Sequence, residues 1–93
     1  MVTRINDFFA ASGKEKALLE FLRSVVSMIE GAPGCRRCEL LVDRENRAHL
    51  VIVETWEDIA SHQAAAGRIP PSQLAAVRPL LARPPEGRYY DAA

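Results

Sequence analysis

The chain has 93 residues, the size of one small domain, and its hydrophobic content of 48% excludes an intrinsically disordered protein. The 12 basic and 12 acidic side chains cancel, so nothing in the charge favours a nucleic acid or an anionic membrane as a partner. No apolar run approaches the roughly 18 residues of a membrane-spanning helix, and residues 1–4 lack the plan of a signal peptide. We therefore expect a single cytoplasmic domain that spans residues 1–93.

The first part of the chain predicts a strand followed by a long helix. Residues 2–10 are rich in side chains that favour strands. Ser12 and Glu15 fit a capping box at the start of the helix, and Gly31 and Pro33 mark its end. Apolar residues recur between these limits at helical spacing and form one broad face: Leu18, Phe21, Leu22, Val25, Met28 and Ile29.

A charged hairpin and a short helix come next. Residues 36–42 and 48–56 predict two strands, joined by a charged loop. The centre of the second strand is nearly continuous in apolar residues, which indicates that both of its faces are covered. Asp58 is the expected N-cap of a short helix that ends near Gly67.

The last part of the chain predicts a further short helix and a final strand. Pro70 and Pro71 start the helix, and Pro79 kinks or ends it. Residues 88–91 predict the last strand. Its two tyrosines, Tyr89 and Tyr90, point to opposite faces, so at most one of them reaches a site on the helix-covered face.

The resulting order, β-α-β-β-α-β, predicts an α+β protein with the ferredoxin-like fold, in which helices cover one face of a four-stranded antiparallel sheet. No further layer remains for the other face, although the strand at 48–56 is apolar on both sides. A symmetric partner whose sheet packs face to face with this one is the economical solution. We therefore expect a homodimer.

The two cysteines, Cys35 and Cys38, have a spacing that is also found in redox and metal sites. A redox pair of this spacing normally opens a helix, whose N-terminus lowers the pKa of the thiol. Here the pair opens a strand, in which positions three apart point to opposite faces. Only His49 and His62 could complete a zinc site. We interpret the cysteines as two ordinary reduced thiols and expect no metal site.

At this point the chain resembles the antibiotic biosynthesis monooxygenase domain family, which belongs to the dimeric α+β barrel group. The resemblance covers nearly the whole chain and rests on the order and spacing of these pieces: Ile5-Asn6-Asp7-Phe8, Gly13, Pro33-Gly34-Cys35, Glu39-Leu40, Glu54-Thr55-Trp56-Glu57-Asp58 and His62. It implies a homodimer with a cleft between helices and sheet in each subunit. The characterised enzymes of the family include oxygenases that act on polycyclic aromatic phenols without metal or flavin, so we expect no cofactor.

Three residues are the candidate catalytic groups: His62, Asn6 and Trp56. The imidazole of His62 can take a proton from an acidic phenol or enol at neutral pH; alternatively it bonds backbone or water at the helix margin. Asn6 could hydrogen-bond a substrate carbonyl or oxyanion, or only a neighbouring side chain. Trp56 could form an aromatic wall against a planar substrate, or simply pack in the core.

Four further residues are candidate substrate contacts. Arg4 and Phe8 lie on the same strand face as Asn6. Phe21 and Ile59 lie on the helix faces that should look onto the sheet. Many members of the family carry a second His or an aromatic residue a few positions after the site of His62. Residues 64–69 of this chain contain neither, which argues against haem ligation.

The leading hypothesis from the sequence is a homodimeric, cofactor-independent monooxygenase that uses dioxygen to oxidise a small aromatic or enolisable molecule. Two alternatives remain open. One is a non-catalytic dimeric module that binds an apolar metabolite. The other is an isomerase or cyclase that uses the same base without dioxygen.

Overall fold

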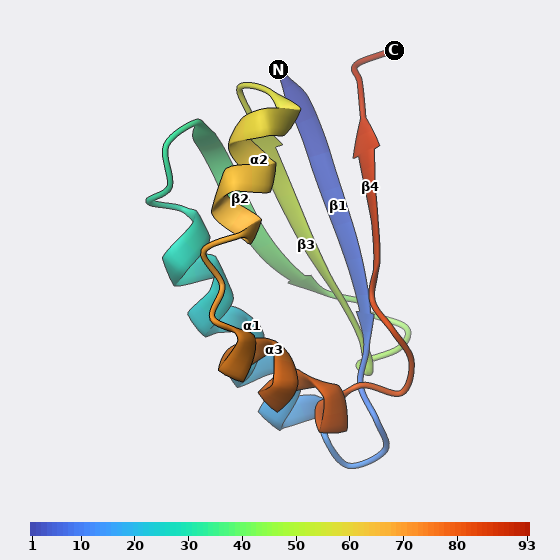
Figure 1. Cartoon of the computed structure of the whole chain (residues 1–93). Helices are drawn as coiled ribbons and strands as arrows, with labels where there is room; N and C mark the ends of the chain where they lie inside the picture. Colours follow the sequence, from blue (N-terminus) through green and yellow to red (C-terminus); the bar gives the residue numbers. More distant parts are fainter.

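Four strands form one antiparallel sheet in the computed structural model, which describes residues 1–93, and their order across the sheet is β2-β3-β1-β4 (Figure 1). The strands are β1 (Val2–Phe9), β2 (Cys35–Val42), β3 (His49–Trp56) and β4 (Glu86–Tyr90). The helices are α1 (Glu15–Ile29), α2 (Ile59–Ala66) and α3 (Pro71–Val77), followed by the short 3-10 helix η1 (Arg78–Leu80). The predicted ferredoxin-like fold is therefore confirmed, and none of its helices is long and apolar enough to cross a membrane.

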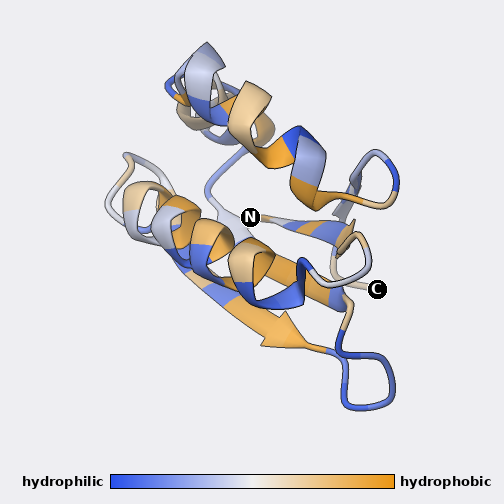
Figure 2. Cartoon of the chain, turned by 90° about the horizontal axis from the view of Figure 1, so that it is seen from below, coloured by the Kyte–Doolittle hydropathy of each residue, from blue (hydrophilic) through white to orange (hydrophobic).

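The helices all lie on one side of the sheet, which we call the inner face; the opposite side is the outer face (Figures 1 and 2). Because side chains alternate along a strand, every second residue of β1 and β3 belongs to the inner face. The inner-face pairs of these two strands are Val2 with Trp56, Arg4 with Glu54, Asn6 with Ile52, and Phe8 with Leu50. The central position of β1 thus brings residues of three strands together under the helices.

The hydrophobic core fills the space between the inner face and the helices. Ten buried residues form it: Val2, Ala10, Leu18, Leu22, Val25, Ile29, Leu50, Ile52, Trp56 and Ala65. The predicted apolar face of α1 is confirmed for most of its members, while Met28 is 42% exposed and lies at the margin of the face. Each large side chain buried here contributes about 1.5–3 kcal/mol to folding, so this layer holds the helices on the sheet.

The outer face is not covered by any part of this chain. In β3 the inner-face residues are buried, whereas the alternate residues remain partly exposed. Leu41 of β2 and Tyr90 of β4, which belong to the outer face, are 47% and 45% exposed. The apolar centre of β3 therefore has one face packed by helices and one face available to a partner.

The helix ends differ in how well the sequence predicted them. Asp58 caps α2 as expected, because its carboxylate accepts the backbone N–H of Ser61 at 2.7 Å. The capping box at Ser12 is wrong: α1 begins after Lys14, whose side chain makes no cap hydrogen bond. Glu15 instead accepts the backbone N–H of Gly13 at 3.1 Å, so its carboxylate stabilises the turn before the helix.

The geometric argument that separated the two cysteines is also wrong. A β-bulge shifts the register of β2 between Cys35 and Arg37, so that Cys35 lies opposite Trp56 and Cys38 opposite Glu54. The extra residue of the bulge shifts the inward–outward alternation of the side chains by one position, so both thiols face inward. Both are free, and burial raises the pKa of each, that of Cys38 to about 12, so the thiols stay protonated.

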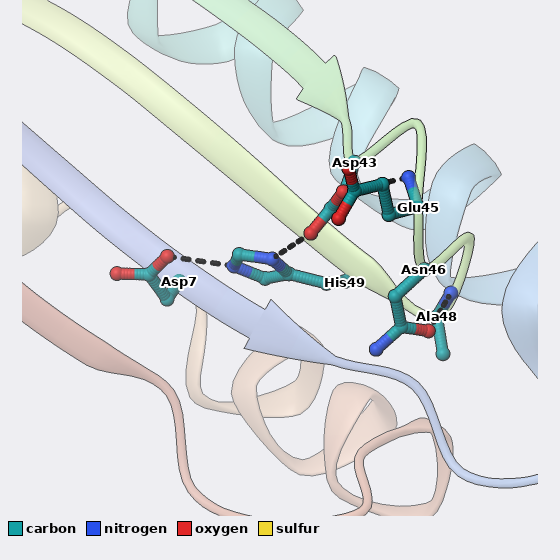
Figure 3. A network of polar contacts seen from close by, with 6 residues as sticks. All are labelled: Asp7, Asp43, Glu45, Asn46, Ala48 and His49. Carbon is teal, nitrogen blue, oxygen red and sulfur yellow. Dashed lines mark hydrogen bonds and ion pairs between the residues drawn. The ribbon is translucent and has the colours of Figure 1, made fainter.

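A polar network on the outer face connects β1, β3 and the loop between β2 and β3 (Figure 3). His49 lies between two carboxylates: its Nδ1 is 2.9 Å from Asp43 Oδ2 and its Nε2 is 2.7 Å from Asp7 Oδ1. The ring of Phe9 stacks on the imidazole with centroids 4.6 Å apart. A neutral imidazole has only one N–H to donate, so both carboxylates are satisfied only by the protonated ring. The hydrogen bonds that His49 donates to Asp43 and Asp7 accordingly raise the pKa of His49, and the bond that Asp43 accepts lowers the pKa of Asp43.

This network predicts a stability that depends on pH. A raised histidine pKa stabilises the fold fully below the ordinary value of 6.5, and this contribution is lost as the pH rises through the raised value. A lowered aspartate pKa contributes above the ordinary value of 3.8 and is lost as the pH falls through the lowered value. We expect the difference in melting temperature between the wild type and His49→Gln to be largest between pH 3.8 and 6.5, where both contributions are complete. The difference should shrink toward alkaline pH as His49 loses its proton. A difference that does not change with pH would contradict the charged network.

Candidate functional site

A cleft of about 280 Å³ opens between the inner face of the sheet and the helices α1 and α2. Most of its wall is apolar, from side chains of the sheet, of both helices and of the segment that follows α2: Phe8, Val25, Ile29, Ile52, Ala65 and Ile69. Four polar residues also line it: Arg4, Asn6, Glu54 and His62. A concave, mainly apolar site with a few convergent polar groups is typical of a small-molecule pocket.

The strand geometry explains why these polar groups meet. Arg4 and Asn6 are alternate residues of β1, so both project from the inner face. Glu54 lies opposite Arg4 on β3, and Trp56 is the next inner-face residue of the same strand. His62 comes from α2, the helix that follows β3 directly, so it lies over the end of the strand that carries Glu54. Two neighbouring strands and the helix that follows β3 therefore supply the four polar groups.

Glu54 is the buried centre of this group, with an exposed fraction of only 1%. Its Oε1 accepts the indole N–H of Trp56 at 2.8 Å, and its Oε2 accepts an amide N–H of Asn6 at 3.0 Å. Burial raises the pKa of Glu54, while the bonds from Trp56 and Asn6 and the charge of Arg4 work in the opposite direction. Both carboxylate oxygens are thus satisfied although the group is removed from water.

His62 is held on two sides by aromatic residues and remains largely shielded from water. Its Nδ1 is 2.5 Å from the hydroxyl of Tyr89, and its Nε2 is 3.9 Å from Oε1 of Glu54. The rings of Trp56 and Tyr89 both meet the imidazole edge to face, with centroids 5.6 Å and 5.3 Å away. Burial, aided by the charge of Arg4, lowers the pKa of His62. The ring is therefore neutral at neutral pH and able to accept a proton.

Arg4 completes the polar group by linking β1 to β4. Its Nε donates to Oδ1 of Asn6 at 3.1 Å, and its guanidinium lies over the ring of Tyr89, 4.6 Å from the centroid. Tyr89 therefore contacts both Arg4 and His62, and it is the one tyrosine of the final strand that faces inward, opposite Arg4. The five polar side chains and Trp56 form one connected network across three strands and a helix.

The structure brings together most of the residues that the sequence singled out. Arg4, Asn6, Phe8, Trp56 and His62 all lie at the cleft. Trp56 forms part of its floor but is completely buried, with 0% exposure, so neighbouring side chains cover the indole.

Two of the predicted substrate contacts lie away from the cleft. Ile59 is 43% exposed, because the inward side of α2 carries His62 and the buried Ala65, which turns the first residue of the helix outward. Phe21 packs against the hydrophobic core from α1, about one turn before Val25 and Ile29, the residues of this helix that border the cleft.

Three residues that shape the polar end of the site were missed by the sequence reasoning: Glu54, Tyr89 and Gly87. A glutamate inside an apolar strand is disfavoured, and its parity with Trp56 was a signal that could have placed it on the inner face. Gly87 borders the cleft on β4, opposite Asn6. The structure has no cluster of three or more His, Cys, Asp or Glu side chains that could hold a metal ion.

Comparison with known proteins gives the same assignment as the fold. The sequence model of the antibiotic biosynthesis monooxygenase family matches residues 1–79. No curated protein sequence matches the chain. A protein from Nitrosomonas europaea superposes with a TM-score of 0.90 at 19% identity, covering 99% of this chain and 98% of that one.

Two further solved structures share the architecture. A protein from Pseudomonas aeruginosa has a TM-score of 0.83 at 26% identity, over 99% of this chain and 94% of that one. A variant of SnoaB, a cofactor-independent oxygenase from Streptomyces nogalater, has a TM-score of 0.80 at 22% identity, over 98% of this chain and 91% of that one. At 22% identity, the likeness to SnoaB shows that the two chains share a fold.

The hydrogen bonds of Glu54 lead to a stability prediction. In Glu54→Gln the amide carries only one acceptor oxygen, so either Trp56 or Asn6 loses its buried acceptor. We expect a loss of about 1–3 kcal/mol in the free energy of unfolding, measured by urea denaturation, which outweighs the relief from removing a buried charge whose oxygens are already satisfied. Glu57→Gln, which changes an exposed ion pair with Arg36, is the control and should stay within about 0.5 kcal/mol of the wild type. Equal stability of Glu54→Gln and wild type would contradict this role.

Proposed function

Because the chain belongs to the antibiotic biosynthesis monooxygenase family, we propose that it is a cofactor-independent monooxygenase that oxidises a small aromatic or enolisable molecule with dioxygen. The observation that carries this proposal is a neutral, largely buried imidazole at the wall of an apolar cleft. SnoaB, a cofactor-independent oxygenase with the same fold, supports the class of reaction. A His62 that faced bulk solvent, or a cleft filled by side chains, would instead have favoured a non-catalytic binding module.

His62 is the proposed general base. In the tautomer that carries its hydrogen on Nδ1, the ring donates to the hydroxyl of Tyr89, and the lone pair of Nε2 remains available for a substrate proton. After it takes this proton, the imidazolium lies 3.9 Å from the carboxylate of Glu54, which stabilises the new charge. Glu54 and Tyr89 are thus proposed positioning residues for the base.

Asn6 and Trp56 take narrower roles in this proposal than the sequence suggested. Asn6 uses one N–H and its carbonyl oxygen within the protein, which leaves its second N–H to donate to a substrate oxyanion. Trp56 acts by holding Glu54 with its indole N–H and by packing beneath the side chains that a ligand would contact. Phe8 and the apolar helix residues supply the surface against which a planar ring can lie.

Deprotonation makes the substrate electron-rich enough to react with dioxygen directly. The anion transfers one electron to dioxygen, and the two radicals combine into a carbon–oxygen bond. The peroxide anion formed in this way takes back the proton held by the imidazolium of His62, which gives a hydroperoxide and restores the neutral base. Loss of water from the resulting hydroperoxide leaves a carbonyl, so one oxygen atom enters the product and the other leaves as water. A methylene carbon that becomes a carbonyl supplies the two hydrogens and all four electrons. The protein contributes positioning and electrostatics to this sequence.

The second part of the proposal is that the active form is a homodimer joined through the outer face. In the middle of this face the apolar residues Ile5, Val51 and Val53 remain partly exposed in the single chain, and Leu41 and Tyr90 on the edge strands are about half exposed. Uncovered apolar side chains at the centre of a sheet are an aggregation hazard unless they are paired, and face-to-face packing of two sheets buries them symmetrically. Such a dimer would leave both clefts open, because they lie on the inner faces.

The proposed base is tested by oxygen uptake with purified, metal-free protein and a set of aromatic quinols and enolisable aromatic ketones. We expect turnover without added metal or flavin, and at least a tenfold loss of kcat in His62→Ala, since general bases contribute about 10²–10⁴ in rate. For the wild type, kcat should fall as the pH drops through the lowered pKa of His62, below 6.5, because the protonated ring cannot accept a proton.

Gln63→Ala, an exposed change on the same helix, is the matched control and should keep full activity. Full turnover in His62→Ala would overturn the proposed mechanism. Turnover of an enolisable substrate without oxygen uptake would instead identify an isomerase or cyclase.

The proposed dimer is tested by a charged substitution on the outer face. Leu41→Glu should shift the protein from dimer to monomer in sedimentation velocity, because dimerisation would bury the new carboxylate without a partner. Leu74→Glu is the matched control: this leucine of α3 is 51% exposed and lies away from the outer face, so the dimer should persist. A wild-type protein that is monomeric at micromolar concentration would overturn this part of the proposal.

A further inference from the structure

The guanidinium of Arg4 reaches the cleft without an acidic partner. Its Nε donates to Asn6, and none of the ion pairs of the chain, counted to 4.0 Å, includes Arg4. The neighbouring Glu54 directs its two oxygens to Trp56 and Asn6 instead. The terminal N–H groups of Arg4 therefore remain available to a ligand in the cleft, and a guanidinium binds planar anions such as carboxylates with particular strength.

The position of this guanidinium is built by the residues around it. Asn6 fixes one edge of the group through the hydrogen bond to Nε, and the ring of Tyr89 supports its face. On β4, Gly87 leaves the space that the group occupies, because a Cβ at this position would collide with Nη2 and Cζ of Arg4 and with Oδ1 of Asn6. Three contacts from two strands thus hold the charge where a long flexible side chain would otherwise move freely.

The rest of the cleft defines what kind of molecule can bring an anion to this point. The polar groups Arg4, Asn6 and His62 lie together, whereas Phe8 and the residues of α1 and the end of α2 form an apolar remainder. An engineered cavity of about 150 Å³ holds benzene, so a cleft of about 280 Å³ suits one or two fused rings. A ligand with four fused rings would extend out of it.

We propose that Arg4 is the anion-binding residue of the cleft and that the substrate is a one- or two-ring molecule with an anionic oxygen at its polar end. This inference rests on the proposed function only in assuming that the same cleft receives the substrate. The anionic oxygen has two possible sources, a carboxylate of the substrate or the ionised phenol or enol itself. In the second case Arg4 stabilises the anion that forms when His62 removes the proton.

The test is a calorimetric titration with three probes of the same ring system: 2-naphthoate, its neutral analogue 2-naphthamide, and 2-naphthol. At neutral pH and low salt, 2-naphthoate should bind the wild type at least tenfold more tightly than 2-naphthamide if the site accepts a carboxylate. If the ionised phenol is the ligand, binding of 2-naphthol should strengthen as the pH is raised through the pKa of the phenol. Either preference should disappear in Arg4→Gln and persist in Arg23→Gln, which removes an exposed arginine of α1.

Binding of 2-naphthamide reports whether the cleft stays intact in Arg4→Gln. If this binding is lost as well, a salt titration of the wild type decides, because an ion pair weakens as salt rises and an apolar contact does not. The inference is overturned if no anionic probe is preferred by the wild type, if the preference survives in Arg4→Gln, or if it does not respond to salt. An Arg4-dependent preference without any oxygen uptake would remove the proposed monooxygenase and leave the anion site standing.

Discussion

The buried carboxylate of Glu54 is the constraint on which the rest of the site depends. A carboxylate without water needs donors on both oxygens, and here they come from Trp56 on its own strand and from Asn6 on the neighbouring one. Those two side chains cannot turn toward a ligand without leaving the charge unsatisfied. The same network fixes Arg4 through Asn6 and places His62 beside a negative group. The side chains at the polar end of the cleft are therefore rigid, because protein groups alone provide the hydrogen bonds that the buried carboxylate needs.

The fold was predictable because its signals are periodic. Helical spacing of apolar residues identified α1, and the β-rich segments identified all four strands to within a few residues. Features that depend on a single residue were not predictable in the same way. The bulge at Arg36 changes the parity of β2 ahead of it, so Cys35 faces the core although alternation predicts the opposite. The capping box was wrong because α1 begins only after Lys14, so Ser12 lies too early to cap it, and Glu15 accepts the backbone N–H of Gly13 in the preceding turn.

The site was predictable where it follows from strand alternation. Arg4, Asn6 and Phe8 share one face of β1, and the structure places all three at the cleft. Helix rotation is harder to predict, because α2 is short and rich in alanine, so its sequence hardly specifies which side turns inward. Ile59 lies outside the cleft for this reason. Glu54 was missed because its importance comes from what surrounds it, and no local pattern in the sequence reports the donors supplied by another strand.

The absent side chain at Gly87 has a consequence for the evolution of this cleft. The guanidinium of Arg4 occupies the volume that any larger residue at position 87 would fill. Positions 4 and 87 are therefore expected to vary together among relatives, with arginine retained only where glycine is retained. A lineage that replaces the glycine first loses room for the cation and can change the charge of its ligand in a single mutational step. Substrate range in such a fold can thus diverge through one edge strand while the core and the base stay the same.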